Sequence, residues 1–230
     1  MRFEPPLRVA RFLGRRKRFF ADLELESGER ATAHIANTGS MRGLTTSGVR
    51  ALVRPSTAKL PFAVEALEVG ETFVGVNTLR ANQVAREALA SGLIPGVDGS
   101  EPIQGEVVLS QGSRIDFVVG SGPRALACEV KSVTMAEGGV ALFPDAVTAR
   151  GRKHLELLSE RVLAGGSALA LFMILRDDVR HFAPATSIDP AWAAALRAAR
   201  DVGVKLSAVR CRVDALGITP IETVPVIIPA

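Results

Sequence analysis

Alternating apolar and polar positions in the first third of the chain predict a series of short strands. Each apolar segment is closed by a turn signal, such as Ser27-Gly28 or Asn37-Thr38-Gly39. This alternation is typical of strands that bury one face. The expected strands cover residues 7–13, 18–26, 30–36, 49–55, 62–69 and 72–77. So many short strands within about 75 residues fit a small barrel or sandwich.

The pattern changes after residue 77, where helical and strand periodicities begin to alternate. Residues 82–90 have helical spacing, and Gly92 ends that helix. A second helix is expected to begin at Asp145, as its N-cap, and to run to about residue 164. The other predicted elements are three strands at 105–110, 114–120 and 125–133 joined by the turns QGS and GSGPR, a buried strand at 168–175, a helix near 190–202 and a late strand at 204–213.

These patterns predict an α/β (α+β) fold with two domains. We expect residues 1–77 to form a small β-barrel, which has the size of a Greek-key barrel of the oligonucleotide/oligosaccharide-binding (OB) type. We expect residues 78–230 to form an α/β sandwich with one central sheet.

Several classes of protein are excluded by composition. Apolar residues make up 47% of the 230 residues, as in ordinary globular proteins, which argues against disorder. No apolar run is long enough to cross a membrane, and Glu4 and two prolines stand where a signal peptide needs an apolar stretch. The two cysteines are too few for a disulfide framework or a cysteine zinc site. We therefore expect a cytoplasmic protein without a membrane partner; the sequence leaves its oligomeric state open.

Positive charge is concentrated at the start of the chain. Lys and Arg number 28 against 24 Asp and Glu, and seven of the basic residues lie within residues 1–18, where Glu4 is the only acid. A basic patch favours a polyanionic partner. The alternative is an edge strand that carries charge against aggregation. The candidate nucleic-acid-binding residues of this segment are Arg15, Arg16, Lys17 and Arg18.

The strongest chemical signal lies in two consecutive predicted strands. Asp116 interrupts the apolar segment RIDF, and Glu129 and Lys131 lie in CEVK. Glu129 and Lys131 share a face of their strand because side chains alternate, and a hairpin brings Asp116 beside Glu129. Two carboxylates in this arrangement are candidate ligands of Mg²⁺ or Mn²⁺, with Lys131 placed to hold a phosphate or orient a water. The alternative is an ordinary cross-strand ion pair.

Further candidates surround this pair. Glu87 on the preceding helix and Glu106 at the start of the first strand are each a candidate ligand or base, or else an ordinary surface charge. Arg150, Lys153 and His154 lie near the start of the second helix, where exposed N–H groups attract phosphate. The turn at residues 34–40 is read as a polar turn of open role.

Segments spread through the chain together resemble the sugar fermentation stimulation protein family of bacteria and archaea. They are FEPPL (3–7), KRFFADL (17–23), AHIANTGSM (33–41), VNT and Asn82 (76–82), SRIDF (113–117), CEVKSVT (128–134), FPDAVTARGRKHL (143–155) and IDP (188–190). Two departures are visible. Ile35 and Ala36 replace the Cys and Pro that the family usually has before the turn, and the basic stretch around residues 58–61 is reduced to AKLP.

The resemblance implies an OB-type barrel followed by a domain similar to the PD-(D/E)xK nucleases. The acidic, Glu and Lys positions of that motif match Asp116, Glu129 and Lys131. The family is linked by name to sugar (maltose) metabolism and is described as binding DNA without sequence preference. We therefore expect a DNA-binding protein with a divalent-metal nuclease-type site. The alternatives are a non-catalytic DNA-binding regulator of sugar metabolism and, on the family name alone, a sugar-phosphate binder.

Overall fold

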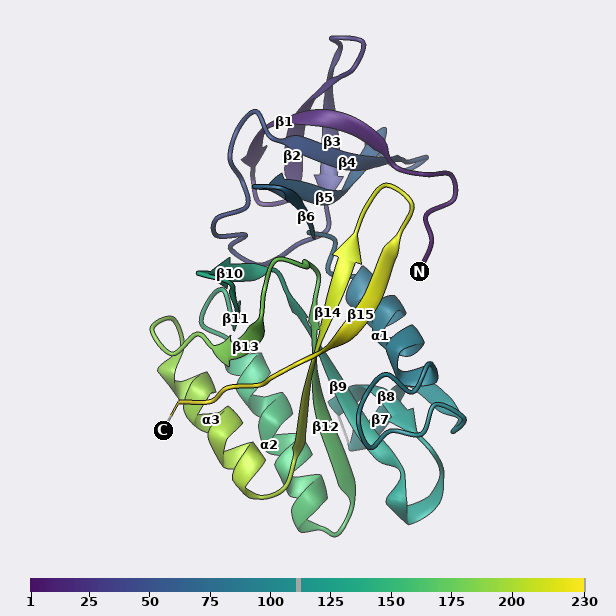
Figure 1. The fold of residues 1–230 in the computed structure, drawn as a ribbon, viewed down its shortest axis with the longest axis vertical. Helices are drawn as coiled ribbons and strands as arrows, with labels where there is room; N and C mark the ends of the chain where they lie inside the picture. The colour runs from purple at the N-terminus through teal and green to yellow at the C-terminus, as the bar shows by residue number, and fades with distance from the viewer. Residues whose placement is uncertain (111–112, 230) are drawn as a thin grey trace.

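The N-terminal strands form a closed barrel, drawn at the top of Figure 1. This computed structural model describes residues 1–110 and 113–229. The strands are β1 (Arg8–Arg16), β2 (Phe20–Leu25), β3 (Arg30–Ile35), β4 (Arg50–Pro55), β5 (Phe62–Val69) and β6 (Thr72–Gly75). Their order is β3-β2-β1-β4-β5-β6, and a parallel pairing of β3 with β5 closes the barrel. Alternate side chains point inward, so Phe12, Leu23 and Ile35 are fully buried.

A larger unit follows, built on a six-stranded sheet of order β15-β14-β12-β9-β8-β7. Strands β9, β12 and β14 run parallel, and the outer pairs are antiparallel. Its elements are α1 (Arg80–Ala90), β7 (Ile103–Ser110), β8 (Ser113–Val119), the 3-10 helix η1 (Gly122–Arg124), β9 (Leu126–Val133), β10 (Met135–Glu137), β11 (Val140–Phe143), α2 (Ala149–Leu163), β12 (Ser167–Ile174), β13 (His181–Pro184), α3 (Pro190–Asp201), β14 (Lys205–Val213) and β15 (Ile218–Val224). The turn predicted at QGS includes residues 111–112, which lie outside the described residues.

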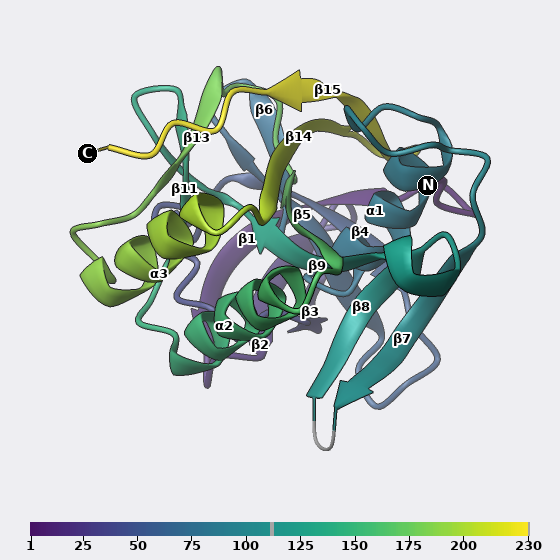
Figure 2. The same cartoon turned by 90° about the horizontal axis from the view of Figure 1, so that it is seen from below.

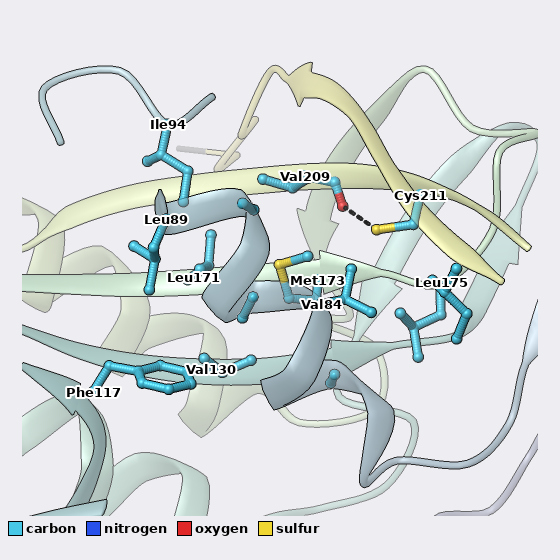
Figure 3. Close-up of a cluster of buried hydrophobic side chains, with 14 of the residues drawn as sticks. Val84, Leu89, Ile94, Phe117, Val130, Leu171, Met173, Leu175, Val209 and Cys211 are labelled. Atoms are coloured by element: carbon cyan, nitrogen blue, oxygen red, sulfur yellow. Dashed lines mark hydrogen bonds between the residues drawn. The ribbon is translucent and has the colours of Figure 1, made fainter. Parts of the chain in front are cut away.

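Helices cover both faces of this sheet (Figure 2). Helix α1 packs on one face, where Val84 and Leu89 join Met173 in one buried cluster (Figure 3). Helices α2 and α3 cover the other face, with Leu158 and Trp192 fully buried. Burial of one such side chain contributes roughly 1.5–3 kcal/mol, so apolar packing holds the helices in place. Within the described part of the chain, no helix is long and apolar enough to cross a membrane.

The expected central sheet, with helices on both faces, is present, but a second, smaller sheet was not predicted. Strands β10, β11 and β13 form a second, three-stranded sheet. These strands have only three or four residues each, too few for alternation to be recognised. The large sheet also has a final strand, β15, that was not expected. It contains Pro220 at a register shift in its pairing with β14, and proline argues against a regular strand.

Helix α2 begins later than expected. Its N-cap is Thr148, whose side chain accepts a 3.0 Å hydrogen bond from the N–H of Gly151. Asp145 is therefore not the cap. Its Oδ2 atom instead accepts hydrogen bonds from the Ser40 hydroxyl and the Met41 N–H, each of 3.1 Å, because the barrel lies against this segment.

Further contacts join the barrel to the large sheet. The N–H of Gly75 donates to the Leu175 carbonyl over 2.8 Å, and a Cβ at Gly75 would lie only 3.2 Å from the Leu175 Cβ. Buried Glu65 of β5 accepts hydrogen bonds from Arg80 (2.7 Å) and Asn77 (2.9 Å) at the start of α1. The first helix of the large unit is thus tied to the barrel through a buried carboxylate.

Candidate metal and nucleic-acid site

Asp116 and Glu129 lie side by side on adjacent strands. Strands β8 and β9 are antiparallel with Phe117 opposite Cys128, a register that brings Asp116 next to Glu129. Asp116 is held from two sides, because its Oδ1 accepts from the Asn82 side-chain amide and its Oδ2 from the N–H of Val130, each over 2.8 Å. The Asp116 carboxylate is therefore fixed in orientation by α1 and by β9.

The two carboxyl groups have opposite pKa shifts. Burial and the charge of Glu129 raise the pKa of Asp116, and the hydrogen bonds from Val130 and Asn82 only partly offset this. Burial also acts to raise the pKa of Glu129, but contacts with His154 and Lys131 outweigh it and leave that pKa below its ordinary value. Glu129 is therefore the firmly ionised member of the pair, and Asp116 is the one that a nearby cation would help to ionise.

Two cationic or basic side chains meet at one oxygen of Glu129. Lys131 Nζ lies 2.6 Å from Glu129 Oε1, and His154 Nδ1 contacts the same oxygen. Lys131 Nζ and His154 Nδ1 are 3.4 Å apart, and Arg150 Nε donates to His154 Nε2 over 3.3 Å. Lys131 therefore faces Glu129, and His154 joins helix α2 to the carboxylate pair.

The start of α2 is held by a buried carboxylate on another helix. Asp189, the N-cap of α3, accepts from the N–H of Thr148 and the N–H of Trp192, each over 2.9 Å. Gly151 is needed at this close approach, because a Cβ there would lie 2.8 Å from a Thr148 methyl carbon. The helix terminus that carries Arg150 is thus fixed against the sheet.

A cavity of about 280 Å³ opens above these groups. Its lining includes Asp116, Glu129, Lys131, Arg150 and His154. This wall is polar and carries both signs of charge, and the Arg150 side chain is exposed at its border. Such a surface is suited to an anionic ligand that binds together with a metal cation.

A second cavity, of about 520 Å³, meets the first at Asp116 and Glu106. Glu87 lines it and is half-exposed, with its carboxylate bound to the Met1 ammonium group. Glu106 is 71% exposed and pairs with Arg114 over 2.8 Å. Glu87 and Glu106 therefore line the cavities beside Asp116, while their carboxylates pair with Met1 and Arg114. Lys153 is exposed on α2, one residue before His154.

The four basic barrel residues have two different kinds of environment. Arg15 donates to the backbone carbonyls of Arg18 (2.6 Å) and Asn37 (2.9 Å), among others. Arg16 pairs with Asp22 over 3.0 Å. Lys17 and Arg18 are exposed on the turn between β1 and β2. Arg15 and Arg16 therefore hold the barrel together, whereas Lys17 and Arg18 face solvent.

Sequence reasoning gave no role to Asn82 or Asp189, and it assigned Asp145 to the cap of α2. Asn82 orients Asp116 through a hydrogen bond, and Asp189 holds the start of α2 in the same way. Asp145 accepts a hydrogen bond from the N–H of Met41 in the barrel. Their partners lie 34, 104 and 41 positions away in the chain, so no local spacing could reveal these contacts. The one available signal was that all three lie in segments that carry the family resemblance.

The donor chemistry of the carboxylate pair fits a hard divalent ion. Partial burial and the neighbouring charge of Glu129 raise the pKa of Asp116, and a cation between the two carboxylates would relieve their repulsion. No cluster of three or more His, Cys, Asp or Glu side chains suited to a metal occurs among the residues that the structure describes. An ion at Asp116 and Glu129 would therefore take its other ligands from backbone carbonyls or water, and it would share Glu129 with Lys131 and His154.

Comparisons with known proteins cover nearly the whole chain. Residues 13–76 match the model of the SfsA N-terminal OB domain, and residues 79–217 match the sugar fermentation stimulation protein RE domain. This match confirms the predicted OB-type barrel. A sugar fermentation stimulation protein homolog from Citrifermentans bemidjiense is 42% identical over 99% of this chain and 100% of its own length. A homolog from Halorhodospira halophila is 45% identical over 98% of both chains.

A solved structure has the same fold. The structure of Pyrococcus furiosus SfsA in complex with Ca²⁺ superposes with a TM-score of 0.89 and 24% sequence identity, covering 99% of this chain and 98% of that one. Both the family models and the relatives therefore agree over both units of the fold. This chain belongs to the sugar fermentation stimulation protein family.

Proposed function

We propose that this protein binds DNA without sequence preference and hydrolyses phosphodiester bonds at a divalent-metal site formed by Asp116 and Glu129. The observation that carries the proposal is the pair of adjacent carboxylates on β8 and β9, half-buried Asp116 and buried Glu129, which line one open cavity together with Lys131. A protein that only binds DNA gains nothing from carboxylates that face phosphate. The similarity of these positions to the PD-(D/E)xK motif supports the same reading.

Five side chains in and beside the cavity have distinct roles in this proposal. Asp116 and Glu129 would hold the ion, and a divalent ion there would supply water activation and charge neutralisation at the phosphate. Asn82 keeps Asp116 in the orientation needed for binding. Lys131 stabilises the negative charge that develops on the phosphate oxygens. Arg150, at the exposed start of α2, binds the adjacent phosphate of the strand.

The relative from Pyrococcus furiosus adds support at the level of the family. Its structure is described as a complex with Ca²⁺. Ca²⁺ and Mg²⁺ both prefer oxygen ligands, although Mg²⁺ requires a smaller and more regular site. The site proposed here, at Asp116 and Glu129, offers the oxygen ligands that such ions prefer.

A second candidate is a DNA-binding protein without catalytic activity. It is favoured by the contacts of Glu129, whose Oε1 atom already has Lys131 at 2.6 Å and His154 against it. These contacts neutralise the buried carboxylate without a metal. In that case Asp116, Glu129 and Lys131 stabilise the fold, and regulation of sugar metabolism would proceed through binding alone.

Cleavage assays separate the two candidates. Supercoiled plasmid and labelled oligonucleotides of both strand types are incubated with Mg²⁺, Mn²⁺ or a chelator. The proposal expects metal-dependent cleavage by the wild type and its loss in Asp116→Asn, while DNA binding survives. Cleavage that is unchanged in Asp116→Asn would place the activity elsewhere. No cleavage by the wild type under any of these conditions would leave the non-catalytic binder.

A further inference from the structure

Two aromatic rings lie together on the outside of the barrel. Phe19 is 39% exposed, and His34 on β3 is also exposed. Their ring planes are 22° apart and their centroids 6.3 Å apart. The pairing of Phe20 with His34 and the 2.9 Å hydrogen bond from the Ile35 N–H to the Phe19 carbonyl hold the two rings in this position. A flat ligand that stacks on one ring therefore lies nearly parallel to the other.

The turn before Phe19 has a strained backbone and carries two cations. Lys17 and Arg18 have φ angles of 45° and 65°, in the left-handed region that residues other than glycine rarely adopt. Strain of this kind persists only where surrounding contacts enforce it, and it is frequent at ligand-binding sites. Lys17 and Arg18 are exposed and directly precede Phe19 in the chain.

Arg15 enforces this conformation. Its Nε atom donates to the Arg18 carbonyl over 2.6 Å, and its other nitrogens donate to the carbonyls of Asn37 (2.9 Å) and Gly39 (3.2 Å). The β1–β2 turn is therefore bound to the Asn37–Gly39 turn through one guanidinium group. The two cations and the two rings are held ready before any ligand arrives, which reduces the entropy cost of binding.

We infer that Phe19 and His34 form a stacking subsite for an unpaired base of a DNA strand, and that Lys17 and Arg18 bind the phosphates on either side of that base. The inference rests on the DNA binding proposed above and makes it specific to single-stranded segments. In a duplex, neighbouring bases cover each base face, so only an unstacked base can lie on these rings. Aromatic platforms beside basic side chains are the usual means of binding single strands.

Hydrogen bonds link the barrel turn next to the subsite to the segment that leads into α2. The Asn37–Gly39 turn, which accepts hydrogen bonds from Arg15, continues to Ser40. The Ser40 hydroxyl donates to Asp145. Asp145 lies three residues before Thr148, the N-cap of α2, and Arg150 follows at the border of the cavity. The turn that Arg15 binds is therefore in contact with the segment that leads to the start of α2.

Binding measurements with matched variants test the inference. Fluorescence anisotropy is recorded for a labelled single strand of about 20 nucleotides and for the duplex of the same sequence. We expect Phe19→Ala to weaken single-strand binding about tenfold, which is the usual size for loss of one stacked base, and to change duplex binding less than about twofold. Phe19→Leu should bind as weakly as Phe19→Ala because it is apolar without a π-face, and Phe19→Trp should restore binding. The control is Leu163→Ala, at the far end of α2, which should bind both DNAs as the wild type does.

The outcomes distinguish this inference from the proposed function. Single-strand affinity that is unchanged in both Phe19→Ala and Phe19→Leu, or lost equally for single strand and duplex, overturns the stacking subsite alone. A wild-type protein that binds neither DNA overturns both proposals. Phe19→Trp gives a second readout, because Trp192 is fully buried in the other unit. The fluorescence of the introduced indole should be quenched when the single strand is added, and an unquenched indole in a bound complex would contradict stacking.

Discussion

The hydroxyl oxygen of Ser40 lies 2.9 Å from the backbone carbonyl and 3.1 Å from the Oδ2 atom of Asp145, across the junction between the barrel and the large sheet. The N–H of Met41 donates to the same Oδ2 atom over 3.1 Å. The polar turn at residues 34–40, whose role the sequence left open, is therefore where the barrel contacts the segment that leads into α2. Through Asp145, this turn supports the position of the α2 N-terminus beside the carboxylate pair.

Gly39→Ala tests this junction. A Cβ at Gly39 would lie 2.5 Å from Asp145 Oδ2, so the variant must push the Asp145 segment away from the barrel. We expect a lower melting temperature and faster amide exchange across residues 143–151. Gly14→Ala is the matched control, because nothing lies within 4 Å of a Cβ at Gly14. Exchange in Gly39→Ala as slow as in the wild type would mean that the contact does not hold this segment.

Glu65→Gln should destabilise the protein in a pH-dependent way. Burial acts to raise the pKa of Glu65, but hydrogen bonds from Arg80, Asn77 and Arg54 outweigh it and lower that pKa. A lowered carboxyl pKa stabilises the fold above the unfolded value, near 4.3, and this contribution is lost as the pH falls toward the folded value. At pH 7 we expect a loss of about 3 kcal/mol in the free energy of unfolding, because the variant breaks a buried ion pair.

Urea denaturation at several pH values measures this effect. The difference between the wild type and Glu65→Gln should shrink as the pH is lowered from 7 toward 4 and below. Glu68→Gln is the control, because Glu68 pairs with the exposed Arg50 and should contribute much less. A difference that stays constant across this pH range would contradict an ionised Glu65 in the folded state.

Arg15 and the pair Lys17 and Arg18 should respond differently to substitution. Exposed lysine and arginine side chains that contact phosphate release counterions, so Lys17→Ala with Arg18→Ala should reduce the slope of log affinity against log salt by about 1 to 2, with little change in melting temperature. Arg15→Ala should instead lower the melting temperature, because backbone carbonyls at two turns lose their donor. A salt slope unchanged in the double variant would exclude both side chains from phosphate contact.

The architecture was predictable where a local pattern reports on burial. Alternation predicted the barrel strands, and the unbroken apolar residues 168–175 predicted the buried strand β12. Both predictions succeeded because each pattern depends on which side chains of the strand are buried. The adjacency of Asp116 and Glu129 followed from the hairpin in the same way.

Other features depend on contacts between distant segments. His154 reaches Glu129 only because β12 pairs with β9 and α2 packs on that sheet. Arg15 looked like a surface cation, since nothing near it in the sequence shows that three carbonyls of a turn more than twenty residues away would accept its hydrogen bonds. Asp145 resembled an N-cap for a similar reason, because its partner lies on the barrel.

Lys131→Ala should separate metal binding from cleavage. Lys131 Nζ lies 2.6 Å from Glu129 Oε1, so its removal leaves that carboxylate more available to an ion. We expect Mn²⁺ to bind at least as tightly as in the wild type and to raise the melting temperature more, while cleavage slows by a factor on the order of 10². Calorimetry and the plasmid assay measure the two effects. Loss of Mn²⁺ binding in Lys131→Ala would assign this lysine to the ion site itself.

The central claim is that Asp116 and Glu129 hold a divalent ion, and anomalous diffraction from crystals soaked in Mn²⁺ tests it most directly. The account predicts an anomalous peak between the two carboxylates in the wild type, with Glu129 shared between the ion and Lys131, and no such peak in Asp116→Asn. A wild-type crystal with no peak there, and with Lys131 and His154 still on Glu129, would contradict it.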